Sequence, residues 1–392
     1  MGLNEVPSGE RIHIGFFGRR NAGKSSLVNK ITNQNLSLVS DVPGTTTDPV
    51  KKAMELLPLG PVVVIDTPGF DDTGELGSMR VEQTKKVLDQ CDIAVLAVSG
   101  EVGFTETERE LISLFEEKDI KYLICYTKAD IKKVEGLSVS SYTGEGIEEL
   151  KEKIASLKDE NVKEKRIIGD ILKPGDKVVL VIPIDESAPK GRLILPQTQT
   201  IRDILDAGAS ALCVKDTEYK KVMDTLDEVR LVITDSQVFA QIQKETKEEI
   251  SLTSFSILMA RHKGTLEDAV KGAREIDNLK DGDEVLIAEA CTHHRQCKDI
   301  GSVKIPALIK KYTGKNVKIT LSSGKDFPND LEKYKLIIHC GGCMATEKEM
   351  EMRLKKAKEK DVAMTNYGIS IAYMNGILER SISPIPEMKE YI

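Results

Sequence analysis

One short stretch constrains the fold of this chain more than any other. The residues Gly18-Arg-Arg-Asn21-Ala-Gly23-Lys24-Ser25 follow the apolar run Ile12–Phe17 and open a helical pattern. This is the phosphate-binding loop pattern in the strand–loop–helix setting that gives it meaning. Glycines let the backbone wrap around phosphates, and its N–H groups hold them. The sequence therefore predicts a nucleotide loop between a buried strand and a helix.

The residues around this loop predict an α/β fold. Short apolar runs alternate with amphipathic stretches over residues 11–157, which is typical of a parallel sheet covered by helices. Within the loop, Lys24 would neutralise β- and γ-phosphate charge and Ser25 would bind Mg²⁺. We expect nucleotide contacts from the whole loop: Gly18, Asn21, Ala22, Gly23, Lys24, Ser25 and Ser26.

Two further stretches fit a nucleotide switch. Asp66-Thr-Pro-Gly69 follows the apolar run Val62–Ile65. Asp66 would hold Mg²⁺ through water, and the N–H of Gly69 would meet the γ-phosphate. In the threonine-rich stretch from Asp41 to Asp48, Thr46 would complete the Mg²⁺ coordination when a triphosphate is bound.

A base-reading pair of motifs selects guanine. Asp130, in Thr127-Lys128-Ala-Asp130, can accept two hydrogen bonds from guanine N1–H and the 2-amino group, a donor pair that adenine lacks. Lys128 would pack along the base, and Ser140-Ser141-Tyr142 matches the loop that reads guanine O6. Four motifs in this order predict a GTPase, and the set resembles the GTPases related to Era and MnmE.

Three residues depart from or extend that pattern. Phe70 stands where many GTPases carry a water-positioning glutamine, so we expect slow intrinsic hydrolysis. Thr127 replaces the usual asparagine of the base motif, which bears on nucleotide affinity. Asn21 resembles the asparagine that supports potassium activation in the MnmE-like group, so a K⁺ ion is expected beside the phosphates.

Bulk composition limits the class of protein. The chain has 392 residues, 40% hydrophobic and 30% charged, with a formal charge of −7, which fits a soluble protein of two to four domains. The charge argues against a nucleic-acid or membrane partner, and no apolar run reaches the roughly 20 residues of a membrane span. We expect a cytoplasmic chain whose seven cysteines are thiols or metal ligands. Cys91, Cys125 and Cys213 lie in or beside apolar runs and should be buried.

Two more α/β units are expected after the charged stretch 158–166. Predicted strands at Val178–Ile184, Ala211–Val214 and Leu231–Ile233, with helical patterns at 200–208, 217–228 and 236–247, show no catalytic motif. This second unit should serve in spacing, docking or self-association. Past residue 256, predicted strands end at Ala288 and Ile338, and cysteines follow both. Open α/β sheets place ligands at that edge.

These cysteines form a ligand pattern. Cys291-Thr-His293 is followed, after 45 residues, by His339-Cys340-Gly-Gly-Cys343. Thiolates prefer zinc and iron–sulfur centres, and spacing alone leaves a Cys₃His zinc site open. A group of buried thiols without metal is the plainest alternative. Cys297 and His294 lie outside the pattern.

Together with the GTPase motifs, this pattern resembles one family over nearly the whole chain: HydF, the GTPase that matures the di-iron site of FeFe-hydrogenase. The resemblance implies a GTPase domain at 1–165, a dimerisation domain at 166–255 and a 4Fe-4S cluster-binding domain at 256–392. It implies that Cys291, Cys340 and Cys343 ligate the cluster, with His293 and His339 as candidate fourth ligands.

The resemblance also implies a role in assembly. The chain would be a homodimeric scaffold that binds GTP or GDP with Mg²⁺, accepts a transient di-iron precursor from radical-SAM maturases and passes it to apo FeFe-hydrogenase. One alternative is a ribosome- or tRNA-associated GTPase of the Era and MnmE kind with a structural zinc domain. A cluster-dependent enzyme gated by GTP is another, although no radical-SAM cysteine triplet is present.

Overall fold

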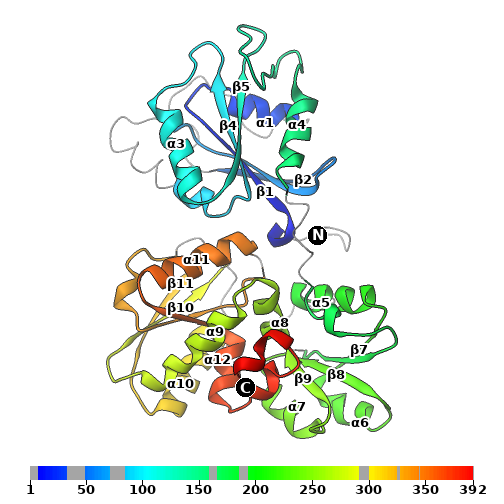
Figure 1. Ribbon diagram of the computed structural model, residues 1–392. Helices are drawn as coiled ribbons and strands as arrows, with labels where there is room; N and C mark the ends of the chain where they lie inside the picture. The colour runs from blue at the N-terminus through cyan, green and yellow to red at the C-terminus, as the bar shows by residue number, and fades with distance from the viewer. Residues whose placement is uncertain are drawn as a thin grey trace. The chain divides into compact units, whose positions relative to one another are not determined.

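The chain forms two compact units, residues 1–163 and 164–392. The structure is a computed structural model, and it describes residues 8–32, 49–70, 84–158, 166–184, 193–290, 300–324, 327–343 and 345–391. Each unit is an α/β assembly (Figure 1). In the part of the chain that the structure describes, no helix combines the length and apolar character needed to cross a membrane.

The first unit contains a five-stranded sheet in the order β2-β3-β1-β4-β5. Its central strands β1, β3, β4 and β5 run parallel, and β2 pairs antiparallel with β3 at one edge. The strands are β1 (Ile12–Phe17), β2 (Val50–Leu56), β3 (Gly60–Asp66), β4 (Ile93–Ser99) and β5 (Lys121–Thr127). The predicted α/β fold with a parallel sheet is confirmed, with one antiparallel strand added.

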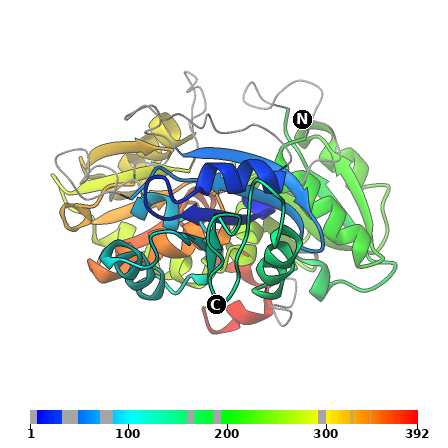
Figure 2. The same ribbon diagram turned by 90° about the horizontal axis from the view of Figure 1, so that it is seen from above.

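Helices cover both faces of this sheet. Apolar side chains of α1 (Lys24–Thr32) and α4 (Ile147–Ser156) pack on one face, and α3 (Glu106–Glu117) and a helix at 84–88 pack on the other. Figures 1 and 2 show α1 and α4 across the sheet from α3. The phosphate loop thus leaves the carboxyl end of β1 in the middle of a sheet that is buried on both faces.

The second unit contains two parallel sheets of four strands, in the orders β7-β6-β8-β9 and β11-β10-β12-β13. The first sheet is built from β6 (Lys177–Val181), β7 (Ser210–Val214), β8 (Val229–Thr234) and β9 (Ser251–Ser254). The second is built from β10 (Glu284–Glu289), β11 (Lys318–Ser323), β12 (Leu336–His339) and β13 (Ala363–Asn366).

The first sheet shares its core with helices and with the end of the chain. Side chains of the first sheet share one apolar cluster with α8 and α9, and with residues from 369 to 388 near the chain's end. The helices of the unit are α5 (Leu195–Asp206), α6 (Tyr219–Met223), α7 (Phe239–Glu245), α8 (Phe255–His262), α9 (Leu266–Ala273), α10 (Ile305–Thr313), α11 (Glu347–Glu359), α12 (Tyr367–Met374) and α13 (Leu378–Ile382). The last segment therefore completes the core of a sheet whose strands lie between Lys177 and Ser254.

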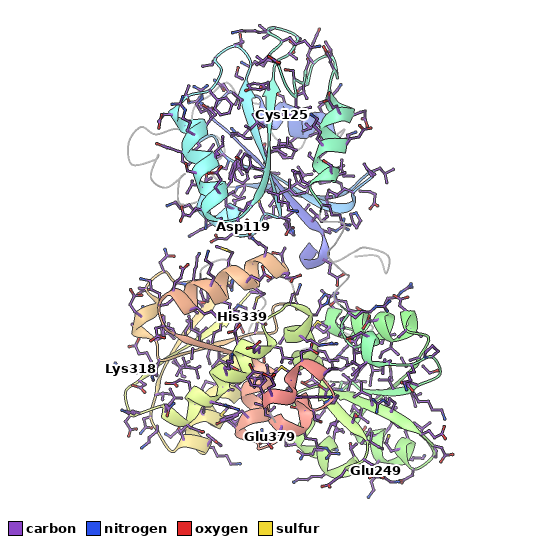
Figure 3. The ribbon with its side chains drawn as sticks, viewed as in Figure 1. Asp119, Cys125, Glu249, Lys318, His339 and Glu379 are labelled. Atoms are coloured by element: carbon purple, nitrogen blue, oxygen red, sulfur yellow. The ribbon has the colours of Figure 1, made fainter. Side chains whose placement is uncertain are left out.

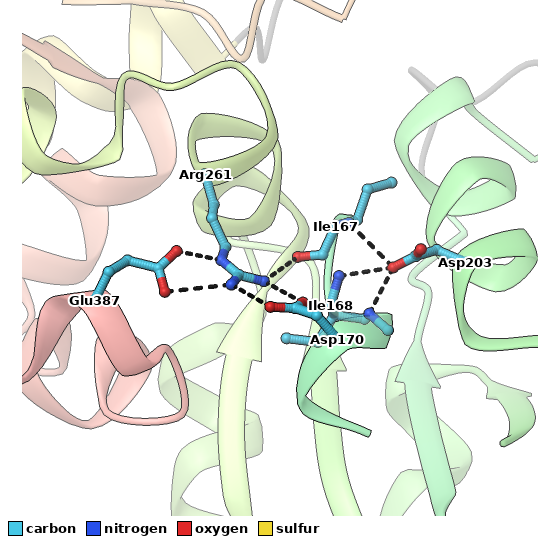
Figure 4. Close-up of polar contacts among 7 residues, drawn as sticks. Ile167, Ile168, Asp170, Asp203, Arg261 and Glu387 are labelled. Carbon is cyan, nitrogen blue, oxygen red and sulfur yellow. Dashed lines mark hydrogen bonds and ion pairs between the residues drawn. The ribbon is translucent and has the colours of Figure 1, made fainter. Parts of the chain in front are cut away.

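A polar cluster fixes the start of this unit (Figure 4). The Asp203 carboxylate accepts hydrogen bonds from the backbone N–H groups of Ile167, Ile168 and Gly169, at 3.1, 2.7 and 2.6 Å. Arg261, on α8, donates to both carboxylate oxygens of Asp170 and of Glu387. One guanidinium thus ties the unit's first turn to its last.

One predicted strand boundary and one predicted burial were wrong. The strand predicted over Val178–Ile184 ends at Val181, and Ile184 is 73% exposed; Pro183 has no N–H to continue a ladder. Cys213 is exposed, because it lies on β7 at the edge of its sheet. The expectation is confirmed for Cys91 and Cys125, which are buried in the first unit.

Candidate functional site

The phosphate loop closes on itself through Lys24. Its ammonium donates to the carbonyls of Gly18 and Arg19, at 2.9 and 2.7 Å, and the side chain is buried. Asn21 has a positive φ of 59° and is an exposed residue of the turn. A lysine held over the loop in this way is placed to meet phosphate oxygens that the loop's N–H groups bind.

The stretch after β3 packs directly on this loop. The N–H of Phe70 donates to Gly18 O at 3.2 Å, and the hydroxyl of Thr67 donates to Phe16 O at 2.6 Å. Gly69 has no room for a side chain, since a Cβ there would lie 2.7 Å from the backbone of Arg20. Phe70 is buried in the sheet's core, so it cannot orient a water as a glutamine would.

Thr127 links the base-reading stretch to the phosphate loop. Its hydroxyl lies 2.6 Å from Ala22 O and 3.2 Å from Val98 O, and its side chain is buried. The threonine hydroxyl at this position therefore bonds the predicted base-reading stretch to the phosphate loop, as an asparagine amide could. Lys128, with a φ of 61°, pairs through its ammonium with Glu101 at 2.6 Å.

The residues predicted to read guanine lie together. The Ser140 hydroxyl donates to Asp130 Oδ1 at 2.5 Å, and the backbone N–H of Ala129 donates to Val139 O at 3.0 Å. Tyr142 is 88% exposed. Of the other predicted nucleotide residues, Ser25 and Ser26 begin α1 half-buried and Asp66 ends β3 buried. Thr46 lies outside the described residues.

Glu108, which the sequence did not single out, supports the loop through Arg19. Arg19 donates through Nε to Glu108 Oε1 at 2.7 Å, and Glu108 is fully buried at the start of α3. Burial raises the pKa of Glu108, but hydrogen bonds from Thr105 and Arg19 outweigh it and hold the pKa below its ordinary value. A glutamate in the first turn of a helix usually serves as a cap, so sequence alone could not assign it to Arg19.

The second candidate site lies at the carboxyl ends of β10 and β12. These neighbouring parallel strands pair Ala288 with His339, and the Cys340 N–H donates to Ala288 O at 2.8 Å. The N–H of Ala290 lies 3.2 Å from Cys340 Sγ. An N–H aimed at sulfur favours the thiolate, which is the form that binds metal.

A tight turn separates Cys340 from Cys343, and both are half-buried. Gly342 has a φ of +62°, and a Cβ there would lie 2.7 Å from Met350 Sδ. Thr346 caps α11 by accepting from Glu349 N at 3.0 Å. The positive end of α11 thus follows the second cysteine, which suits a negatively charged centre.

His339 is held on both sides of its ring. Nδ1 lies 2.7 Å from Cys340 O, and Nε2 lies 2.9 Å from a guanidinium nitrogen of Arg353. Because the guanidinium can only donate, Nε2 accepts and Nδ1 carries the proton. Burial, with the charge of Arg353, lowers the pKa of His339 to about 3. The imidazole is neutral, and in this arrangement neither nitrogen points a lone pair at a metal. Figure 3 labels His339 within the second sheet.

Arg353 is a second residue that the sequence did not single out. It is buried on α11, pairs with Glu349 at 2.7 Å, and donates to Gly324 O at 2.8 Å. Its helix is rich in charged residues, so no pattern distinguishes the one arginine that turns inward. Arg353 ties the end of β12 to α11 and to the loop after β11.

The metal-ligand predictions fall partly outside the described residues. Cys291, His293, His294 and Cys297 all lie in the stretch 291–299 that the structure does not describe. Within the described residues, no three or more His, Cys, Asp or Glu side chains gather as a metal site. The donors that are described, two cysteines on a turn beside a helix start, fit an iron–sulfur or zinc centre chemically.

Three family models match the chain. They are the 50S ribosome-binding GTPase over residues 13–128, the hydrogen maturase F dimerization domain over 167–264, and the hydrogen maturase F tetramerization domain over 267–384. The last two together span more than half of the chain. The chain belongs to the hydrogen maturase F family. The predicted P-loop GTPase domain and the predicted HydF resemblance are both confirmed.

Curated relatives resemble the first unit. GTPase Der of Wolinella succinogenes is 32% identical over 174 residues, 39% of this chain and 36% of that protein. The tRNA modification GTPase MnmE of Desulforamulus reducens is 34% identical over 117 residues, 30% of this chain and 25% of that protein. The matched part thus spans a quarter to about a third of these relatives' length. The alternative of a ribosome or tRNA GTPase accounts for this unit alone, whereas the hydrogen maturase F models account for the second.

Solved structures also match part of the chain. Era from Aquifex aeolicus bound to GDP.AlF4- covers 52% of this chain and 94% of its own, with 18% identity and a TM-score of 0.34. The G domain of the T. maritima FeoB iron transporter covers 38% of this chain and 99% of its own, with 25% identity and a TM-score of 0.30.

Proposed function

We propose that this chain is a GTP-hydrolysing scaffold that holds a 4Fe-4S cluster and delivers a di-iron precursor to apo FeFe-hydrogenase. The observation that carries the cluster is the 3.2 Å contact between Ala290 N and Cys340 Sγ. Cys291 follows Ala290 directly in the sequence, so the residue that bonds Cys340 Sγ is the sequence neighbour of the first cysteine of the motif. Membership of the hydrogen maturase F family supports the cargo and its recipient.

Three thiolates, from Cys291, Cys340 and Cys343, would hold the cluster and leave one iron for an exchangeable ligand. When bound, the cluster would supply that open coordination position to the precursor. The contacts of His339 argue against this histidine as the fourth ligand. We assign it instead to orienting the Cys340 backbone, and His293 stays a candidate.

GTP binding and hydrolysis in the first unit would control when the precursor is transferred. GTP with Mg²⁺ would bind at Lys24, Ser25 and Asp66, with Thr46 closing on the metal. Asn21 would hold K⁺, so phosphate release should be faster in KCl than in NaCl; equal rates would remove this ion. Self-association through the second unit, and exchange with radical-SAM maturases in the cytoplasm, complete the proposal.

Iron content tests the proposal. Protein reconstituted anaerobically should bind about four irons per chain and no stoichiometric zinc. Cys340→Ser should lose the brown colour and most iron while binding GTP normally. Cys213→Ser is the matched control, because that thiol is exposed on an edge strand outside the motif. Unchanged iron in Cys340→Ser would overturn the cluster assignment.

Transfer is tested with apo-hydrogenase. Protein loaded with the di-iron precursor should activate apo-hydrogenase, and Lys24→Ala should keep its iron but lose the dependence of transfer on GTP. If Lys24→Ala also fails to assemble the cluster, the two halves do not have separable roles.

A further inference from the structure

Side chains of two elements outside the phosphate loop hold it at two different points. At the end that opens α1, the Thr127 hydroxyl of β5 donates to Ala22 O at 2.6 Å. At the end that follows β1, the Arg19 side chain reaches α3, where its Nε donates to Glu108 Oε1 at 2.7 Å. The Arg19 guanidinium also donates to Gly103 O, between β4 and α3, at 3.4 Å. Each end of the loop is therefore tied to a different element.

The end of the loop that follows β1 packs against the stretch after β3. The N–H of Phe70 donates to Gly18 O at 3.2 Å, and a Cβ on Gly69 would lie 2.7 Å from the backbone of Arg20. Gly69 is the residue predicted to meet the γ-phosphate. This end of the loop should therefore border the third phosphate of GTP, which GDP lacks.

Arg19 also bears on the lysine that is predicted to bind phosphate. The Lys24 ammonium donates to Arg19 O at 2.7 Å and to Gly18 O at 2.9 Å. The Arg19 side chain anchors the backbone that carries the first of these carbonyls, and so it helps to set where the ammonium lies. A displacement of about 1 Å in a positioned group can cost an enzyme roughly a hundredfold in rate.

Glu108 is a firm anchor for Arg19. Its side chain is fully buried, and Oε2 accepts from the backbone N–H and the hydroxyl of Thr105 at 2.8 and 2.5 Å. These two bonds cap α3 without any contribution from Arg19. The bond from Arg19 is charge-assisted and partly buried, which makes it stronger than a neutral hydrogen bond. Loss of Arg19 should thus release one end of the loop while α3 keeps its cap.

We propose that Arg19 is a positioning residue that supports the binding of GTP more than that of GDP, because it holds the loop where the γ-phosphate binds. The inference rests on the proposed function, since it assumes that nucleotide and Mg²⁺ bind at this loop. Arg19 acts through its own backbone and through Lys24, which meets the phosphates. Thr127 holds the other end of the loop and should serve both nucleotides alike.

The affinities of two nucleotides separate these roles. The full chain is titrated calorimetrically with GDP and with the non-hydrolysable GTP analogue GMPPNP, each in the presence of Mg²⁺. In Arg19→Met, GMPPNP affinity should fall by about tenfold or more while GDP affinity stays within about threefold. Thr127→Val should weaken both nucleotides to a similar extent. Arg109→Met, which removes an exposed arginine of α3, should change neither affinity.

The outcomes distinguish the inference from the site on which it rests. Wild-type protein that binds neither nucleotide would overturn the proposed nucleotide site itself. An equal loss of GMPPNP and GDP in Arg19→Met would overturn the inference, because a merely loosened loop weakens both, and so would two unchanged affinities.

Arg19→Lys decides the matter if Arg19→Met does not fold. Lysine keeps the charge beside Glu108 but not the fixed position of the Nε donor. The ratio of GMPPNP affinity to GDP affinity should therefore fall by about threefold or more relative to wild type. An unchanged ratio in Arg19→Lys would then overturn the inference.

Discussion

At the residue scale, the predicted guanine-reading site depends on Asp130 and Ser140, two side chains ten residues apart. The Ser140 hydroxyl donates to Asp130 Oδ1 over 2.5 Å, and the N–H of Thr143 donates to the same hydroxyl at 3.1 Å. The carboxylate is therefore oriented before any base arrives. Orientation in advance lowers the entropy cost of binding.

Asp130→Asn should reverse the choice of base. An amide presents donors where guanine also presents donors, whereas xanthine has a carbonyl at position 2. GTP affinity should fall by at least about a hundredfold, as expected for two lost charge-assisted bonds, and XTP affinity should rise. Titration with fluorescent analogues of the two nucleotides measures both. Asp119→Asn, on the same unit but before β5, is the control, and unchanged GTP affinity in Asp130→Asn would contradict the assignment.

At the element scale, the turn between Cys340 and Cys343 depends on Gly342 and not on Gly341. Gly342 has a φ of +62° and a Cβ there would meet Met350, whereas Gly341 has open space. Gly342→Ala should destabilise the second unit by about 1–3 kcal/mol and reduce iron uptake, because the turn must shift. Gly341→Ala should leave both unchanged. Chemical denaturation and iron analysis measure the two effects; equal behaviour of the two variants would contradict this account of the turn.

The elements that sequence predicts well are those buried on both faces. The runs Ile12–Phe17 and Ile93–Val98 read as continuous apolar strands, and they lie at the centre of the first sheet. The edge strand β2 was missed because it alternates half-buried and exposed residues and carries a lysine on each face. Strands β9 and β13 have four residues each and carry Ser, Thr or Asn, so neither length nor apolar content distinguishes them from loops.

The sequence could propose the motifs of the candidate site but not the residues that support them. Spacing alone singled out Lys24, Asp130, Cys340 and Cys343, because the proposed chemistry requires those residue types in fixed order, and their roles stay predictions. Arg353 acts through a tertiary contact with His339. A basic residue on a charged helix is ordinarily solvated, so no local pattern could single it out.

At the scale of the whole molecule, the second unit is closed by its own ends. Arg261 binds Asp170 from the first turn and Glu387 from the last. The apolar cluster that contains β6 also contains Ile382 and Ile385. The sequence could not predict that the end of the chain packs on this sheet, because several helices have an apolar face whose sequence pattern fits the sheet equally well.

This closure should depend on pH. Hydrogen bonds from Arg261 hold the pKa of Asp170 below its ordinary value. A carboxyl with a depressed folded pKa stabilises the protein above its unfolded pKa of about 4, and that contribution is lost as pH falls through the folded pKa. Asp170 is 42% exposed, so the contribution should be below about 1 kcal/mol.

Asp170→Asn separates this contribution from the rest. The free energy of unfolding, from urea denaturation, should fall less steeply for Asp170→Asn than for wild type between about pH 5 and pH 3. Asp216→Asn supplies the matched comparison. Parallel pH profiles for Asp170→Asn and wild type would show that the clamp adds nothing.

The central claim is that the sulfur atoms of Cys291, Cys340 and Cys343 meet around iron at the carboxyl ends of β10 and β12. Anomalous diffraction at the iron edge, from crystals of reconstituted protein, tests it most directly. We expect one iron cluster bonded to all three sulfurs, with Ala290 N–H still directed at Cys340. A zinc signal in its place, or sulfurs that bond no iron, would contradict the account.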